Sequence, residues 1–245
     1  MVTLCVSFLA IFLASFFATV SGFGYALIAT PILSTVINIK FAIMAVLVTT
    51  MVLRGITMWR VWGQFNWNTV VMTTIGSAVG TAPGSYALKL MSVETLEIFL
   101  GSVLLIATFL MSQQYTVPVA NKTLGRFTAG AISGFFSAST SVGGPPLVLY
   151  FLNEKQDKDT MRANMIWIFG LSSVLVMVGH FFAGNVDAIT DWSLLLFMLP
   201  AMFLGIYLGE KFFFRLNQHL FKRLSLIIVC CGALAMLISG IRGSL

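Results

Sequence analysis

Long uncharged stretches dominate this sequence. No charged residue occurs before Lys40, and further uncharged runs cover 61–88, 98–121, 127–153, 163–186, 192–209 and 224–241. At about 1.5 Å per helical residue, each run is long enough to cross a hydrocarbon core of about 30 Å. Only 9% of the 245 residues are charged, whereas soluble domains carry about 25%. The chain is therefore predicted to be an all-α polytopic membrane protein whose surroundings are the lipid bilayer.

The charge and the cysteines exclude several other classes. The net charge of +6 comes mainly from Lys and Arg that flank the apolar runs, the pattern of cytoplasmic anchoring, so no nucleic-acid partner is expected. Cys5, Cys230 and Cys231 lie in apolar runs without metal-ligand spacing and are interpreted as small hydrophobic residues. No metal and no cofactor is predicted. The first apolar stretch lacks a basic start and continues past residue 30, which favours mature structure over a signal peptide.

A pattern of aromatic and small residues occurs in both halves of the sequence. FFATVSGFGY at 16–25 corresponds to FFSASTSVGG at 135–144, at an offset of 119 residues. Further along, one Trp and two Gly recur at an offset of 125: Trp67, Gly80 and Gly84 correspond to Trp192, Gly205 and Gly209. We therefore predict two structural repeats, 1–113 and 122–245, which together form one membrane domain.

Each predicted repeat opens with an interrupted apolar segment. Residues 3–38 would extend about 54 Å as one helix, too long for one crossing, and the sequence SGFG at 21–24 lies halfway along. In the second repeat, STSVGGPP at 139–146 interrupts the run 127–153. Gly is conformationally loose and Pro removes a backbone donor, so both interrupt helices. Two interpretations stay open: breaks inside the protein, where freed backbone groups are tolerated, or simple turns outside the membrane.

Breaks inside the protein would predict a binding site for an anion. Interrupted segments in corresponding places of two repeats are typical of transporter substrate sites. A helix that starts inside the membrane presents unpaired N–H groups and a partial positive charge, and two such ends facing one another would cradle an anion. The candidate substrate-binding residues at the breaks, whose hydroxyls would add donors, are Ser21, Gly22, Phe23, Gly24, Tyr25, Ser139, Thr140, Ser141, Gly143, Gly144 and Pro145.

Three more helices are expected after each opening segment, at about 41–60, 67–88 and 95–112, and at about 162–183, 192–210 and 221–241. Small residues four positions apart, as at Gly76, Gly80 and Gly84, suit close helix packing in lipid. If each opening segment turns back on itself, the repeats are inverted, and ten Lys and Arg lie in the cytoplasm against three outside. A parallel arrangement gives nine against four, so the positive-inside rule favours inversion narrowly.

The motifs GFGYALIATPIL at 22–33 and SVGGPPLVLYFL at 141–152 resemble those of the sulfite exporter TauE/SafE family. The resemblance covers essentially the full chain, with two repeats, a Gly-rich break near the start of each, and small-residue helices later. In the first motif, Phe23 and Tyr25 stand where more glycine is expected. The resemblance implies a transporter of sulfite, an organosulfonate or another organic anion in the cell inner (plasma) membrane. A second copy of the chain, forming a homodimer, is a candidate partner.

Three further residues, Arg54, Asn164 and Trp167, have two interpretations each, and His180 has one. Arg54 either neutralises the substrate with its guanidinium or snorkels towards the cytoplasmic face. Asn164 either hydrogen-bonds the substrate or bridges two helices. His180 is expected to be a satisfied histidine near the membrane interface. Trp167 either stacks on an aromatic substrate or packs against its neighbours.

Three functions compete on this sequence. The first is a secondary transporter with alternating access around a site between the two broken helices. The second is an anion channel with the same breaks as its constriction. The third is an intramembrane hydrolase that pairs Ser139 or Ser141 with His180, which would need a contact between serine and histidine. The sequence favours the transporter, and no enzymatic activity is predicted.

Overall fold

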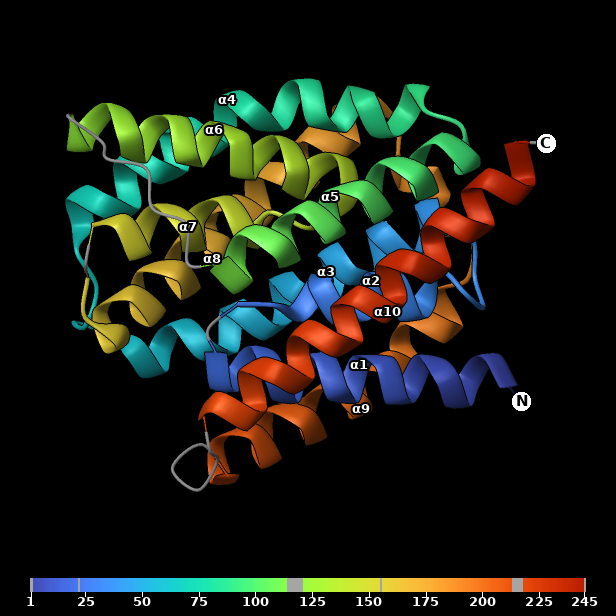
Figure 1. Ribbon diagram of the computed structural model, residues 1–245, viewed down its shortest axis with the longest axis horizontal. Coiled ribbons are helices and arrows are strands. Elements are labelled where there is room, and N and C mark those ends of the chain that lie inside the picture. The colour runs from blue at the N-terminus through green and yellow to red at the C-terminus, as the bar shows by residue number, and fades with distance from the viewer. Residues whose placement is uncertain (1, 22, 114–120, 155, 213–217, 245) are drawn as a thin grey trace. The chain divides into compact units, whose positions relative to one another are not determined.

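The computed structural model describes residues 2–21, 23–113, 121–154, 156–212 and 218–244 (Figure 1). In these ranges the chain forms ten α-helices and two short 3-10 helices, Trp59–Val61 and Val186–Ala188, so the all-α prediction is confirmed. The α-helices are α1 (Val2–Ser21), α2 (Tyr25–Leu33), α3 (Ile39–Met58), α4 (Trp67–Leu90), α5 (Val93–Gln113), α6 (Lys122–Thr140), α7 (Gly144–Asn153), α8 (Lys158–Ala183), α9 (Trp192–Phe212) and α10 (Gln218–Ser244).

Both predicted breaks are places where one helix ends and a short one begins. Helix α1 ends at Ser21 and α2 begins at Tyr25, and α6 ends at Thr140 and α7 begins at Gly144. Gly24 has a φ of 91°, a left-handed conformation that favours glycine. In the second break the left-handed residue is Ser141, with a φ of 62°. Gly22 and the side chain of Ser21 lie outside the described part of the structure.

The helices group into two compact units, and each unit combines both halves of the sequence. One contains residues 1–49, 91–109 and 187–245, and the other contains residues 50–90 and 110–186. In the second unit, α4 from the first half packs along α6 from the second half; in the first unit, α9 packs along α1 (Figure 1). The predicted repeat boundaries, 1–113 and 122–245, and the inverted orientation of the repeats stay predictions.

Glycines allow α4 and α6 to approach to backbone contact. A Cβ on Gly80 would overlap the carbonyl oxygen of Ala131, and a Cβ on Gly84 would lie 2.5 Å from the carbonyl oxygen of Phe135. The predicted role of these glycines in close packing is therefore confirmed. Without Cβ atoms at the interface, the two helices gain dispersion contacts along their backbones, which is how helices associate in lipid.

The same contact occurs between α9 and α1. A Cβ on Gly205 would lie 2.5 Å from the carbonyl oxygen of Phe12, and one on Gly209 would lie 2.9 Å from that of Phe16. Gly205 and Gly209 lie 125 residues after Gly80 and Gly84. Their contact residues, Phe12 and Phe16, lie 119 residues before Ala131 and Phe135. The two sequence offsets therefore relate equivalent contacts in the two units.

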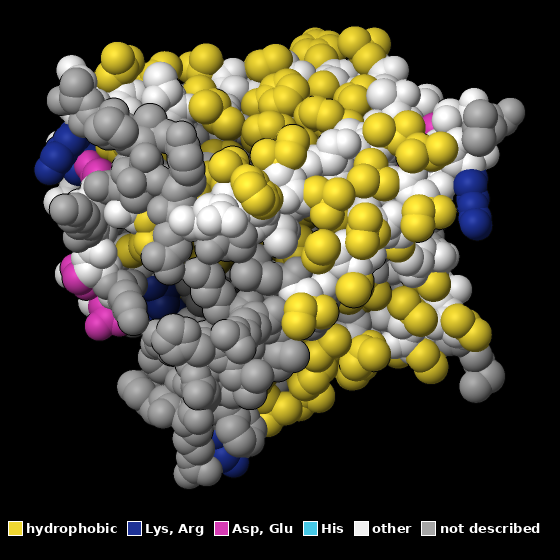
Figure 2. Space-filling model, in the orientation of Figure 1, with side chains coloured by type: hydrophobic (Ala, Val, Ile, Leu, Met, Phe, Trp, Pro, Cys, Tyr) yellow, Lys and Arg dark blue, Asp and Glu magenta, His cyan; other side chains and the backbone are white. Residues whose placement is uncertain are grey.

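The exterior and the helix lengths suit a bilayer. Five described helical segments are long and apolar enough to cross a membrane: Val2–Val20, Ile39–Val61, Val93–Leu110, Asp159–Ala183 and Trp192–Lys211. Helix α4 is less apolar because its buried face consists largely of glycine, serine and threonine. On the face shown in Figure 2, hydrophobic side chains predominate and the few visible charged ones lie towards the edges.

Side-chain caps mark the starts of α6 and α8. Asn121 Oδ1 accepts hydrogen bonds from the amides of Thr123 and Leu124 at 3.0 and 3.2 Å. Asp157 accepts from the amides of residues 159 and 160, and its hydrogen bonds, chiefly to Thr160, lower the pKa of its carboxyl below the ordinary value. Such caps satisfy amides that have no partner inside the helix, so these polar residues set where each helix begins.

Within the second unit, α4 and α8 run in the same direction. The amide of Asn66, before α4, donates to Asn164 near the start of α8 at 2.7 Å, while Asn185, after α8, donates to the carbonyl of Ser85 near the end of α4 at 2.8 Å. The α6–α7 segment turns back on itself, because the Tyr150 hydroxyl donates to the carbonyl of Lys122 at 2.9 Å. The starts of α4, α6 and α8 therefore share one end of this unit.

This arrangement predicts a labelling pattern. Single cysteines at Gln64 and Asp157, in a variant without the three native cysteines, are expected to be shielded from an impermeant thiol reagent added outside intact cells, because Lys and Arg concentrate at that end. A cysteine at Gly184, whose Cβ position lies 3.9 Å from Lys89 Nζ at the far end of α4, should react. Labelling of positions 64 and 157 from opposite sides of the membrane would contradict the placement of these two positions at the same end of the unit.

Candidate functional site

At the first break, a helix starts whose first amides have no acceptor within the helix. The first residues of α2 are Tyr25, Ala26 and Leu27, and the first four amides of any helix lack intrahelical acceptors. Tyr25 is buried, with 2% of its surface exposed, whereas Phe23 and Gly24 are partly exposed. The left-handed Gly24 directly precedes α2 and sets the direction of this turn. The arrangement can donate backbone hydrogen bonds to an anion.

The second break uses its hydroxyl groups internally. Ser139 donates to the carbonyl of Phe135 at 2.8 Å, and Thr140 donates to that of Phe136 at 2.7 Å. The Ser141 hydroxyl donates to the carbonyl of Thr140. Each of these hydroxyl hydrogens is therefore bonded to a backbone carbonyl of α6, and none of the three is directed to a ligand in this conformation. The sequence pattern identified the hydroxyls but not their bonding.

The two proline residues limit what α7 can donate. Gly144 begins this helix, and Pro145 and Pro146 follow in its first turn. Because proline has no N–H group, the amides of Gly143 and Gly144 are the main donors at this end. The first turn of α2, in contrast, contains no proline and therefore offers more donors.

Gly143 has a packing role in this structure. Its φ is −87°, which any residue adopts, and a Cβ there would overlap the Ser137 hydroxyl and lie 2.6 Å from the carbonyl oxygen of Ser133. The Ser133 hydroxyl also donates to the Gly143 carbonyl at 2.7 Å. These contacts join the start of α7 to α6. Substitution of Gly143 would thus disturb packing whether or not a ligand binds nearby.

Arg54 is a buried cation on α3. Only 2% of its surface is exposed, and its guanidinium carbon lies 5.7 Å from the ring centroid of Phe169 on α8. A side chain that snorkelled would reach the surface, so the burial favours the functional interpretation of Arg54. A guanidinium over an aromatic face makes a cation–π contact, and its planar fork carries several hydrogen-bond donors.

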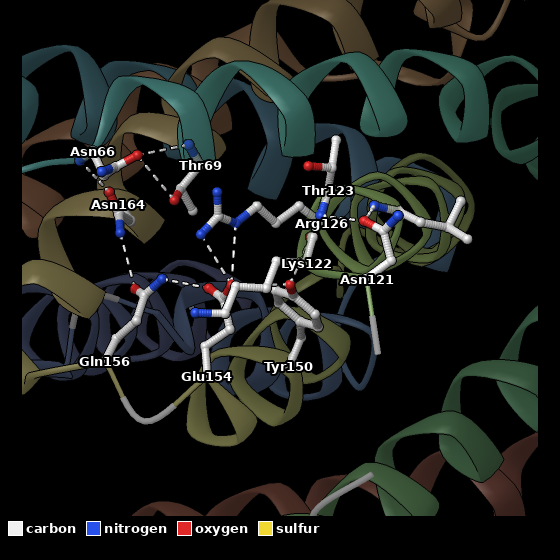
Figure 3. A network of polar contacts seen from close by, with 11 residues as sticks. Asn66, Thr69, Asn121, Lys122, Thr123, Arg126, Tyr150, Glu154, Gln156 and Asn164 are labelled. Carbon is white, nitrogen blue, oxygen red and sulfur yellow. Dashed lines mark hydrogen bonds and ion pairs between the residues drawn. The ribbon is translucent and has the colours of Figure 1, made fainter. Parts of the chain in front are cut away.

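Asn164 belongs to a polar network rather than standing alone (Figure 3). Its Oδ1 accepts from the amide of Asn66 at 2.7 Å, and its Nδ2 donates to Gln156 at 2.9 Å. Gln156 in turn donates to Glu154 at 2.7 Å. Asn164 is fully buried, and both ends of its amide are used in these links. The structure therefore shows the bridging role that the sequence analysis left as one of two interpretations.

A mostly buried ion pair completes the network. Arg126 on α6 donates through Nε and Nη2 to one oxygen of Glu154, after the end of α7, at 3.2 and 3.0 Å. The side chains are 14% and 6% exposed. This pair was not predicted from the sequence, although its two charges directly bracket the uncharged run 127–153. In a segment that turns back on itself, such bracketing charges can meet.

We expect Arg126→Ala to destabilise the protein strongly. Glu154 would keep a buried carboxylate without its cation, a loss that typically costs about 3–5 kcal/mol. The melting temperature of the purified protein should fall well below that of Lys122→Ala, which removes an exposed cation four residues away. Equal melting temperatures for the two variants would contradict a structural role for the pair.

Trp167 packs in an aromatic cluster. Its ring stacks on Phe65 with 4.4 Å between centroids, and Trp62 and Trp67 lie 5.2 and 5.7 Å away. Trp62 and Trp67 are exposed, whereas Trp167 is 7% exposed. The packing interpretation of Trp167 therefore holds in this structure, and the exposed indoles suit an interfacial aromatic belt.

His180 is completely buried in the last turn of α8, and its place near the membrane interface stays a prediction. Its Nδ1 lies 2.9 Å from the side-chain nitrogen of Asn185. As the Ser139 and Ser141 hydroxyls donate to backbone carbonyls, their hydrogen bonds do not form the serine–histidine pair that the hydrolase hypothesis requires.

Comparisons with known proteins agree with this architecture. The family described as "Sulfite exporter TauE/SafE" matches residues 7–236. The protein named "Probable sulfite/organosulfonate exporter TauE" from Cupriavidus necator is 24% identical over 206 residues, which cover 81% of this chain and 79% of that protein. No solved structure matches the chain. The chain therefore belongs to the sulfite exporter TauE/SafE family and is a multi-pass membrane transporter.

Proposed function

We propose that this protein is a secondary transporter that carries a small anion, sulfite or an organosulfonate, across the cell inner membrane by alternating access. The name of the Cupriavidus necator relative supports this class of substrate. The observation that carries the proposal is the start of α2. There the left-handed Gly24 precedes a helix whose first turn contains no proline, so every residue of that turn has a backbone N–H group. A homodimer stays a prediction.

The proposed substrate contacts are assigned separately in each unit. In the first unit they are the backbone amides at the start of α2, with Gly24 and Tyr25. In the second unit they are the amides of Gly143 and Gly144, together with the Arg54 guanidinium. Backbone amides at a helix start combine hydrogen-bond donors with a partial positive charge, which suits an oxyanion. A guanidinium binds two oxygens of a sulfonate in one plane.

Arg54→Ala is expected to weaken binding of the anion about tenfold or more, because a hydrogen bond to a charged partner contributes about 1.5–3 kcal/mol. Arg54→Lys should restore only part of the affinity, since an ammonium lacks the planar fork. The measurement is titration of the purified variants with sulfite and with alkyl and aryl sulfonates, and with sulfate and carboxylates for comparison.

Arg60→Ala is the matched control, because Arg60 is an exposed cation six residues along the chain. Its affinity should equal that of the parent. If Arg54→Ala binds every sulfur anion like the parent, the proposed role of Arg54 is wrong. If the parent binds none of them, the proposed substrate class is wrong.

An anion channel is the second candidate function, since the same helix starts could line a constriction. Large single-channel currents from the reconstituted protein would support it. The family match to an exporter favours the carrier.

A further inference from the structure

A continuous series of hydrogen bonds joins the start of α4 to the end of α7 (Figure 3). The backbone amide of Asn66 donates to Asn164 at 2.7 Å, and Asn164 donates to Gln156 at 2.9 Å. Gln156 donates to one carboxylate oxygen of Glu154 at 2.7 Å, and Arg126 donates to the other oxygen at 3.0 Å. The series therefore connects α4, α8, the end of α7 and α6.

The two ends of this series fix the direction of every bond between them. A backbone amide only donates, so Asn164 faces Asn66 with its oxygen, and its nitrogen donates to Gln156. An ionised carboxylate only accepts, so the nitrogen of Gln156 faces Glu154. Neither side-chain amide can turn over without bringing two donors or two acceptors together. The series therefore has one ordered arrangement.

Helices α4, α6 and α8 are also held together by contacts that do not involve Gln156. Helix α6 meets α4 at backbone distance, since a Cβ on Gly134 would overlap the carbonyl oxygen of Ser77. At the far end of α8, Asn185 donates to the carbonyl of Ser85 on α4 at 2.8 Å. These three helices therefore form a framework against which the remaining short helix, α7, is placed.

Helix α7 is bonded to this framework near its two ends. At its start, the Ser133 hydroxyl donates to the Gly143 carbonyl at 2.7 Å, close to the left-handed Ser141. Near its end, the Tyr150 hydroxyl donates to the carbonyl of Lys122 at 2.9 Å. A strained residue at the end of a helix, beside glycine, is typical of hinges. The second break is thus a hinge for α7, and the bonds at the other end of α7 hold it in place.

We propose that Gln156 is a positioning residue for transport. It forms a latch with Asn164 and Glu154 that holds the end of α7 to α8, and this latch opens when the site changes the side of the membrane to which it is accessible. The proposal rests on the proposed function, because it gives alternating access a moving part.

The chemistry of the latch suits reversible opening. Buried ionic and polar groups are often no more stabilising than apolar packing, and one of their roles is to act in a switch. The bond that opens joins two neutral amides, Gln156 and Asn164, and is weaker than the charge-assisted bonds between Arg126 and Glu154. Gln156 is half-buried, so water at this end of the unit can replace the broken bond.

The test compares Gln156→Ala, which removes the latch but keeps the ion pair of Glu154, with a matched control. Gln64→Ala is that control, because Gln64 is an exposed glutamine before α4 at the same end of the unit. The measurement is hydrogen–deuterium exchange of amides 147–153 of α7 in the full-length protein in proteoliposomes, with sulfite on both sides of the membrane or with none. Amides 129–139 of α6 are the internal reference.

In the parent, sulfite on both sides should raise exchange at 147–153 and leave 129–139 unchanged, because transport opens the latch. Gln156→Ala should raise exchange at 147–153 about tenfold without sulfite, since two hydrogen bonds are lost. Its sulfite affinity should stay within about threefold of the parent, because the length of α7, about 15 Å, separates Gln156 from the proposed anion contacts. Gln64→Ala should match the parent in every measurement.

Two results would overturn the latch. The first is equal exchange at 147–153 in Gln156→Ala and the parent. The second is exchange in the parent that sulfite leaves unchanged while uptake proceeds, since Gln156 would then belong to a fixed strut. If the parent takes up no sulfur anion, the proposed function fails, and the role of the latch in transport fails with it.

Discussion

Gly80→Ala is expected to lower the melting temperature by roughly 6–12 °C or to prevent folding. The added Cβ would overlap the Ala131 carbonyl oxygen, and α4 could accommodate it only by moving away from α6 along the whole contact. Overpacking costs about 1–3 kcal/mol where side chains can adjust. Here the neighbour is backbone, so the cost lies at the upper end, about 3 kcal/mol, and each kcal/mol shifts the melting temperature by about 2–4 °C in a chain of this size.

The matched control is Gly55→Ala, in the interior of α3. A Cβ at this position meets no atom within 4 Å, and alanine favours a helix over glycine by about 0.5–1 kcal/mol. Its melting temperature should equal or slightly exceed that of the parent. If Gly80→Ala melts like Gly55→Ala, the close approach of α4 and α6 is wrong.

Gly24→Ala is expected to weaken sulfite binding at least tenfold, about 1.4 kcal/mol. The φ of 91° at Gly24 is a left-handed conformation that costs an L-residue about 1–2 kcal/mol. Relief of that strain would turn the backbone at the start of α2 and move its first amides away from the anion. The measurement is sulfite affinity of the purified variant, with the melting temperature recorded beside it.

Gly63→Ala separates strain from binding. Gly63 also has a left-handed backbone, with a φ of 80°, and a Cβ there meets no atom within 4 Å. Both variants should therefore lose similar stability, but Gly63→Ala should bind sulfite like the parent. If the two variants bind equally well, the first break is only a turn, and the site must be sought around Arg54.

Much of the fold could be predicted because lipid imposes a simple rule on the sequence. Uncharged length and small-residue spacing predicted the six helices that follow the opening segments and both breaks, since backbone groups must be satisfied within helices. The offsets of 119 and 125 residues also proved informative, because they relate the α4–α6 contact to the α9–α1 contact. The packing of α4 from the first half against α6 from the second half, and of α9 against α1, could not be predicted. No local sequence pattern specifies which helix another helix packs against.

The polar chemistry of the candidate site was less predictable. Ser139 and Thr140 were expected to be donors to a ligand, but their hydroxyls bond to carbonyls four residues earlier, an option that any helical serine or threonine has. The effect of Pro145 and Pro146 on the donors of α7 can be read from the sequence once the helix start is known. The contacts of Asn185 with Ser85 and of Asn164 with Asn66 join segments distant in sequence, so they required the structure.

Counterflow in proteoliposomes tests the central claim most directly. Purified protein is reconstituted into vesicles loaded with unlabelled sulfite, and uptake of radiolabelled sulfite is followed against vesicles without internal sulfite. A carrier that alternates access predicts saturable uptake that internal sulfite accelerates and that Gly24→Ala reduces, whereas Gly63→Ala does not. Uptake that rises linearly with concentration and is indifferent to internal sulfite, or the absence of uptake for every sulfur anion tried, would contradict the account.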